Sequence, residues 1–117
     1  MADTEIATLL TQADKSRLSG DYEGAIPLYQ KILDRAADHL AASIGLAHCY
    51  LNTGLFDESL EWFKRAGQEH PTDAKVLIDL AKAYLMLGFF DEGKQTLLDV
   101  LAIDPDNEEA KRQLSYF

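Results

Sequence analysis

The sequence predicts an all-α protein, an α-solenoid of three helix–turn–helix repeats followed by a seventh, capping helix. Three glycines, Gly20, Gly54 and Gly88, recur at a spacing of 34 residues, since 20 + 34 = 54 and 54 + 34 = 88. Segments with apolar residues at helical spacing lie on both sides of each glycine. No segment shows the alternation of apolar and polar residues that is typical of a strand. One helical unit is therefore repeated along the chain.

Each repeat is predicted to turn at its glycine, which can end a helix in a left-handed conformation without a steric penalty. An aromatic residue follows two positions later, as Tyr22, Phe56 or Phe90. Acidic residues come next, and negative charge stabilises the N-terminus of a helix, where backbone N–H groups lack partners. The repeat is therefore interpreted as one helix, a tight turn and a second helix.

The first helices of the repeats are expected near residues 3–19, 40–53 and 73–87. An alanine recurs on the inward face of all three: Ala13, Ala47 and Ala81. In the second and third repeats this face is extended by large apolar residues: Leu46, Tyr50, Leu80 and Tyr84. The first repeat has Gln12 and Ser16 instead, which suits a terminal repeat with no neighbour on its outer side.

The second helices are expected near residues 22–35, 56–69 and 90–103. Each carries a small residue that permits close approach of a neighbouring helix: Ala25, Ser59 and Gly93. Apolar residues four and then three positions further on share that face: Tyr29, Phe63 and Leu97, then Ile32, Ala66 and Val100. Pro27 falls in about the first turn of its helix, where its missing N–H costs little.

Breaks and a final helix complete the prediction. Pro71 and Pro105 lie 34 residues apart and follow the second helices of the second and third repeats, and the first repeat has Ala37 at that place. The segment after Pro105 predicts a capping helix near 107–116. Its inward face holds Ala110 and Leu114, with Phe117 as a further candidate.

Composition narrows the function. The 117 residues carry a formal net charge of −9, which argues against phosphate backbones or anionic lipid surfaces as partners. No apolar stretch reaches the ~20 residues needed to span a bilayer, and no signal peptide pattern is present at the N-terminus. The single cysteine, Cys49, excludes an intrachain disulfide and favours a reducing compartment. We therefore expect a cytoplasmic protein that binds neither nucleic acid nor membrane.

The repeated residues resemble the tetratricopeptide repeat (TPR) family, whose unit is a 34-residue helix–turn–helix with small residues in both helices and a proline near its end. The resemblance covers nearly the whole chain, as one domain over 1–117 with repeats near 6–39, 40–73 and 74–107 and a capping helix at 107–117. It departs from the family pattern where Leu9, Ser43 and Leu77 stand in place of tryptophan. The resemblance implies a right-handed superhelix.

The resemblance also implies a concave groove, lined by the first helices, that binds a partner protein or peptide. The groove positions that carry the prediction are Leu10, Asp14, Arg17, Ile44, His48, Leu51, Asn52, Ile78, Lys82, Leu85 and Met86, with Arg112 on the capping helix. Three of these form an apolar row with one member in each repeat: Leu10, Ile44 and Ile78. The alternative is that this row packs in part against its own second helices, because apolar stripes at helical spacing are usually core.

The charges expected on the groove face are mostly positive. Arg17, Lys75, Lys82 and Arg112 stand against Asp14 and Glu109, so that 4 − 2 = +2. The best-known subclass of the family grips the terminal carboxylate of chaperone tails with lysine, asparagine and arginine side chains. At the matching positions only Lys82 keeps the required sign, and Asp14 would repel a carboxylate. The sequence therefore argues against this chaperone-tail specificity.

The chain offers few groups for catalysis or for holding a metal or cofactor, and none of these is expected. His48 and Cys49 are adjacent, so on a helix they point about 100° apart and cannot bind one ion together. His39 and His70 have no partner at ligand spacing, and Cys49 is interpreted as a small buried residue. The predicted function is a non-catalytic protein-interaction module. The alternative is a structural scaffold that self-associates or belongs to a longer repeat array.

Overall fold

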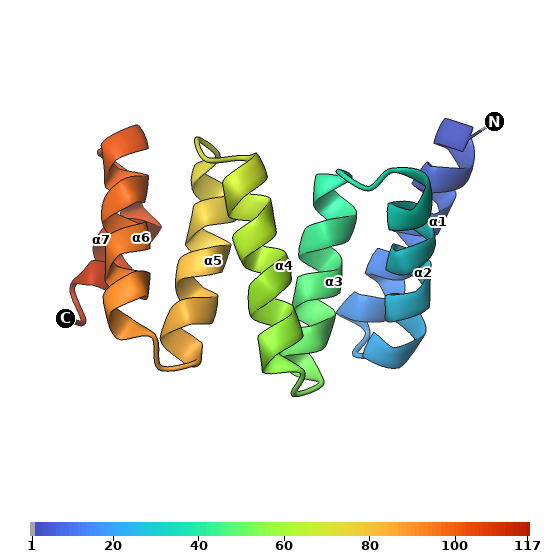
Figure 1. Ribbon diagram of the computed structural model, residues 1–117, viewed down its shortest axis with the longest axis horizontal. Helices are drawn as coiled ribbons and strands as arrows, with labels where there is room; N and C mark the ends of the chain where they lie inside the picture. Colours follow the sequence, from blue (N-terminus) through green and yellow to red (C-terminus); the bar gives the residue numbers. More distant parts are fainter. Residues whose placement is uncertain (1) are drawn as a thin grey trace. The chain divides into compact units, whose positions relative to one another are not determined.

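The computed structural model describes residues 2–117, which form helices joined by short turns (Figure 1). The helices are α1 (Ala2–Leu18), α2 (Tyr22–Arg35), α3 (Leu40–Asn52), α4 (Phe56–Glu69), α5 (Ala74–Met86), α6 (Phe90–Ile103) and α7 (Glu108–Leu114). No strand occurs within this range. The predicted all-α class, with three helix–turn–helix repeats and a seventh helix, is confirmed. The chain divides into two compact units, Met1–Trp62 and Phe63–Phe117, and each is described by itself.

The repeating glycines have the conformation that the sequence predicts. Gly20, Gly54 and Gly88 have φ of +88°, +85° and +86°, and no other residue among 2–117 has positive φ. After α5, the N–H of Phe89 bonds the carbonyl of Tyr84 at 2.8 Å and the N–H of Gly88 bonds that of Leu85 at 3.2 Å. This pair of bonds is a Schellman motif, which satisfies the last carbonyls of the helix.

The links between repeats also recur at the 34-residue spacing. His39, Asp73 and Asn107 cap α3, α5 and α7, and each side chain accepts a bond from a backbone N–H three residues on, at 3.2, 3.3 and 2.9 Å. His39 is thus a half-buried helix cap, a role that the sequence analysis did not assign to it. A side-chain acceptor at this position replaces a partner that the helix start lacks.

Pro27 lies further into its helix than expected. It is the sixth residue of α2, beyond the first turn, so its missing N–H leaves the carbonyl of Glu23 without a helical partner. Both residues are exposed. Water can therefore reach the unpaired carbonyl, which limits the cost to the helix.

The core of the first unit forms where the small residues allow helices to approach closely. Its buried members come from α1, α2 and α3: Ala13, Ala25, Tyr29, Ile32, Ala42, Leu46 and Cys49. Ser59 in α4 is fully buried, and its hydroxyl donates a 2.9 Å bond to the carbonyl of Ala47. The predicted inward faces of these helices are therefore confirmed.

The core of the second unit is built on α5 and α6 and is covered by α7. Its buried members are Leu77, Ala81, Leu97, Val100 and Ala110, and Leu114 packs against them. Phe117, a further candidate for the inward face, is 53% exposed, so that expectation is wrong. Helix α7 ends at Leu114, so Phe117 no longer follows the helical register.

Among residues 2–117, no helix is both long and apolar enough to cross a membrane.

Candidate functional site

In the first unit, the predicted groove residues lie on α1 and α3 with different degrees of exposure. Leu10 and Ile44 of the apolar row are half-buried, and Leu10 packs against the core. His48 and Leu51 are half-buried, whereas Asn52 is exposed and donates a 2.8 Å bond to the carbonyl of His48. The row is therefore partly core and partly surface, as the alternative from sequence allowed.

Asp14 and Arg17 are held by a buried tyrosine rather than left open to a partner. The hydroxyl of Tyr29 donates a 2.5 Å hydrogen bond to Oδ1 of Asp14 and accepts a 2.9 Å bond from Nε of Arg17. Arg17 and Asp14 also form an ion pair at 3.7 Å. Since Tyr29 is fully buried on α2, this network joins α1 to the second helix of its own hairpin. Sequence reasoning identified all three residues but not their connection.

The environment of Tyr29 keeps its phenol protonated. Burial, reinforced by the hydrogen bond to Asp14, raises the pKa of Tyr29 to about 12, while Arg17 acts in the opposite direction. The ring fits against α3 because position 45 is glycine. A Cβ on Gly45 would lie 2.3 Å from Cζ of Tyr29, far inside van der Waals contact. Gly45 therefore has a packing role that the sequence analysis missed, although a glycine in mid-helix is a signal for close approach.

Cys49 lies beside this network and is not a reactive thiol. It is fully buried, and burial raises the pKa of its thiol to about 11; Arg17 lowers that pKa and Asp14 raises it further. A thiol with such a pKa stays protonated near neutral pH and is a poor nucleophile. The interpretation of Cys49 as a small buried residue is confirmed.

In the second unit, the predicted groove residues on α5 differ in how much of their side chains is exposed to solvent. Ile78 and Leu85 are half-buried and pack against the core. Leu85 lies over Gly93 of α6, where an added Cβ would come within 2.6 Å of its Cδ2. Met86 is 68% exposed. Of these three apolar side chains, Met86 offers the most surface to a partner.

The two predicted cationic anchors of this unit share one carboxylate. Lys82 Nζ lies 2.6 Å from Oε1 of Glu109, and Arg112 pairs with the other oxygen of the same side chain. Gln113 also donates a 3.4 Å bond to Glu109. The Glu109 side chain is only 22% exposed, whereas those of Lys82 and Arg112 are 45% and 62% exposed. The trio keeps one net positive charge, spread over two accessible cations.

Exposed aromatic residues of the second unit form a feature that sequence reasoning did not assign to the site. A cavity of about 340 Å³ is lined by Leu85, Phe90, Gln113, Tyr116 and Phe117. Phe90 and Tyr116 are 59% and 76% exposed, and Lys94 Nζ lies 5.8 Å from the centre of the Phe117 ring. The signal in the sequence is the aromatic pair that follows the last helix.

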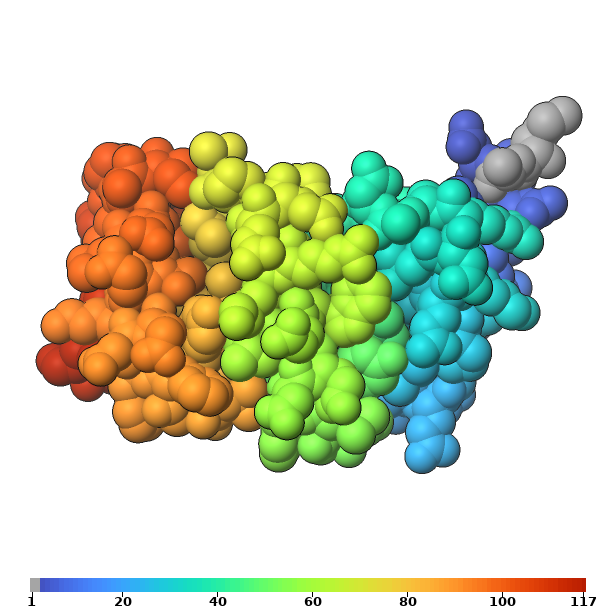
Figure 2. Space-filling model, in the orientation of Figure 1, coloured from blue at the N-terminus to red at the C-terminus, as the bar shows by residue number. Residues whose placement is uncertain are grey.

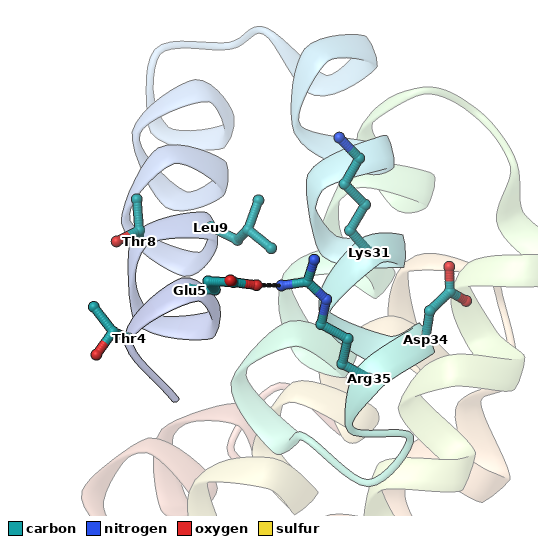
Figure 3. A pocket seen from close by; sticks show the side chains of 7 residues that line it. All are labelled: Thr4, Glu5, Thr8, Leu9, Lys31, Asp34 and Arg35. Carbon is teal, nitrogen blue, oxygen red and sulfur yellow. Dashed lines mark hydrogen bonds and ion pairs between the residues drawn. The ribbon is translucent and has the colours of Figure 1, made fainter. Parts of the chain in front are cut away.

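A polar cavity of about 550 Å³ lies between α1 and α2 of the first unit (Figure 3). Figure 3 shows Arg35 reaching across from α2 to pair with Glu5 of α1. Apart from Leu9, its lining side chains are polar or charged: Thr4, Glu5, Thr8, Lys31, Asp34 and Arg35. This cavity therefore offers mainly polar and charged contacts.

Four charged residues of the predicted groove are engaged in contacts within their own units. Within the described range, no cluster of three or more His, Cys, Asp and Glu residues could hold a metal ion. In the first unit, Tyr29 joins Asp14 and Arg17, and in the second unit Glu109 pairs with Lys82 and Arg112.

Comparison with known proteins identifies the repeat. The family model described as tetratricopeptide repeat matches residues 17–67 and 56–114. The protein CTR9 homolog of Arabidopsis thaliana is 37% identical over 92 residues, which cover 78% of this chain and 8% of that protein. The chain spans between 7% and 19% of the lengths of five such curated relatives.

Solved structures share the fold over almost the whole chain. The second TPR domain of human RPAP3, in complex with the HSP70 peptide SGPTIEEVD, has a TM-score of 0.85 at 22% identity and covers 99% of this chain and 97% of its own. The first TPR of Spaghetti (RPAP3), bound to the HSP90 peptide SRMEEVD, has the same TM-score and identity, covering 97% of this chain and 90% of its own. At this identity the likeness shows the fold.

Proposed function

The chain belongs to the tetratricopeptide repeat family, and we propose that it is a non-catalytic interaction module that binds a segment of a partner protein along the first helices of its repeats. The single observation that carries the proposal is the partly exposed apolar row. Leu10, Ile44 and Ile78 recur once per repeat and keep part of their surface accessible.

Related folds support a peptide partner, since two of the structural neighbours hold chaperone peptides. The residues of this chain favour a different ligand chemistry from a terminal carboxylate. Asp14 places a negative charge on α1, and the one matching cation, Lys82, is already paired with Glu109. A partner segment with apolar side chains fits the row better. Apolar contacts can form without breaking these internal ion pairs.

The test is a variant that removes accessible apolar surface without touching the core. Ile44→Ala, Leu51→Ala and Met86→Ala change half-buried or exposed side chains, whereas Leu10, Ile78 and Leu85 pack against the cores and are left intact. The matched control changes three exposed apolar residues elsewhere: Leu55→Ala, Leu98→Ala and Ile103→Ala. Circular dichroism should show equal helicity for both variants.

Affinity capture with mass spectrometry then compares the two variants with the wild-type chain. We expect proteins captured by the wild type to be lost from the Ile44, Leu51 and Met86 variant and retained by the control. Equal capture by both variants would reject the proposed surface. Loss from both would show that capture depends on apolar exposure in general rather than on Ile44, Leu51 and Met86.

A second candidate function is self-association through the exposed aromatic residues of the second unit. The observation that favours it is the cavity lined by Phe90, Tyr116 and Phe117, because exposed aromatic clusters are typical of interfaces. Light scattering over a concentration series tests it. A mass that rises with concentration and returns to that of a monomer in Tyr116→Ser/Phe117→Ser would support self-association, and a constant monomer mass would reject it.

A further inference from the structure

A second apolar cavity lies in the second unit, between α4 and α6, away from the predicted groove residues. Its volume is about 400 Å³. Its apolar lining comes from three helices and the turn after α4: Gly67, Pro71, Leu77, Leu80 and Tyr84, with Thr96 on α6. Figure 2 shows atoms of α5 between those of α4 and α6 on this face. None of the lining residues belongs to the proposed partner-binding row.

The repeat spacing explains why the cavity is open. Gly67 corresponds to Leu33 of the preceding repeat (33 + 34 = 67), and Thr96 corresponds to Trp62 (62 + 34 = 96). In the first unit, Leu33 and Trp62 both pack against the core. In the second unit, Gly67 lacks the leucine side chain and Thr96 lacks the indole ring of these counterparts. Both residues line the cavity.

One residue of the second unit is larger than its counterpart in the preceding repeat, but it fills only part of the cavity. Leu77 stands where the preceding repeat has Ser43 (43 + 34 = 77). Leu77 and Leu80 are each 8% exposed and lie beside Gly67, where an added Cβ would come 3.6 and 3.1 Å from their Cδ2 atoms. They form an apolar floor with room above it, because Gly67 on the α4 side carries no side chain.

The polar group in the wall of the cavity is already hydrogen-bonded within the protein, whereas the rim offers polar groups to a ligand. The hydroxyl of Thr96 already donates a 2.8 Å bond to the carbonyl of Glu92. At the rim stand Lys64, Gln68 and Asp99. Oδ1 of Asp99 accepts a 3.0 Å bond from Gln95, and a carboxylate has further lone pairs that can accept an N–H. The site therefore combines an apolar interior with acceptors at its edge, which suits a ring that is apolar apart from one N–H donor.

We propose that this cavity is a docking site for a tryptophan side chain presented by a segment of a partner protein. The occupant is inferred from the first unit, where a tryptophan and a leucine at the same repeat positions pack against the core. An indole from outside would restore the missing ring, cover Leu77 and Leu80, and direct its N–H to Asp99 or Gln68. Buried tryptophans in such pockets carry a large share of the binding energy at interfaces.

The first experiment returns the indole from within the chain. Thr96→Trp places the ring at the position that Trp62 has in α4, and Thr96→Val, of nearly the same size as threonine, is the matched control. We expect Thr96→Trp to raise Tm by a few degrees and to add blue-shifted fluorescence that resists quenching by iodide. A lower Tm than that of Thr96→Val, with emission typical of solvent-exposed indole, would overturn the proposal, because the cavity would then not accept the ring.

The second experiment supplies the indole from solution. N-acetyl-L-tryptophanamide is titrated into the ¹⁵N-labelled chain, with N-acetyl-L-alaninamide as the control probe. We expect saturable shifts of the backbone amides of Gly67, Leu77, Leu80 and Thr96 with the first probe only, and their loss in Thr96→Trp. No saturable shift up to the solubility limit, or equal shifts in Thr96→Trp, would overturn the proposal. Neither result depends on whether the row along the first helices binds a partner.

Discussion

The hydroxyl of Tyr29, which is fully buried in the first unit, donates a 2.5 Å hydrogen bond to the carboxylate of Asp14. This contact joins α1 to α2 and gives Asp14, a predicted groove residue, a structural role. Arg17 completes the network through its 2.9 Å bond to the same hydroxyl. The side chains of Asp14 and Arg17 are therefore already held in position within the first unit.

Replacing Tyr29 by phenylalanine should destabilise the protein without abolishing its fold. The change removes both hydrogen bonds of the buried hydroxyl and leaves Asp14 and Arg17 with only each other, so we expect a loss of about 1–2 kcal/mol in the free energy of unfolding. Urea denaturation followed by circular dichroism measures this. Tyr116→Phe changes a 76% exposed tyrosine and should leave the midpoint unchanged. Equal effects of the two changes would show that the network contributes nothing to stability.

The stability should also fall at alkaline pH in a way that depends on Tyr29. Its pKa is raised from 10.0 to about 12, so the unfolded chain loses the phenolic proton first. The stabilisation is complete below pH 10.0, declines between the two values and is lost above about pH 12. Cys49 acts in the same direction, since its pKa is raised from 9.0 to about 11.

Denaturation midpoints at a series of pH values between 8 and 11.5 measure this dependence. We expect the wild-type midpoint to decline more steeply with pH than that of Tyr29→Phe, which lacks the phenol. Parallel declines in the two proteins would contradict the raised pKa of Tyr29.

Two helical glycines should respond differently to the same substitution. Gly45→Ala forces a Cβ to within 2.3 Å of the Tyr29 ring, whereas the Cβ of Gly67→Ala would lie 3.1 Å from the movable end of Leu80, beside an open cavity. We expect the first change to cost about 1–3 kcal/mol through overpacking. The second should be neutral or should stabilise by up to about 1 kcal/mol, because alanine favours the helix. Thermal denaturation of the pair measures the difference, and equal shifts in Tm would contradict the close packing of Gly45.

Glu109→Gln should release the two cations that share this carboxylate. Lys82 and Arg112 are substantially exposed, so we expect only about 0.5 kcal/mol of destabilisation at low salt, and less in 1 M NaCl. Glu108→Gln, one residue earlier on the exposed face of the helix, is the matched control. A loss that is equally large in high salt would mean that Glu109 acts through packing rather than through its charge.

Much of the fold could be predicted from the sequence because it depends on local rules. A glycine with positive φ ends each first helix, as the spacing of Gly20, Gly54 and Gly88 predicted. The small residues Ala25 and Ser59 are fully buried where helices meet. These features follow from backbone conformation and helical periodicity, both of which act over a few neighbouring residues.

The surface chemistry was decided by contacts between helices. Asp14 and Arg17 were predicted to line a groove on the basis of the family resemblance, yet the buried Tyr29 across the hairpin binds both. The opening beside Gly67 exists because a second small residue, Thr96, lines it from another helix. The sequence by itself determined where helices begin, turn and end, and which faces are buried. Only the tertiary structure decided which polar side chains are paired and where space is left, because both depend on distances across packed helices that local periodicity does not specify.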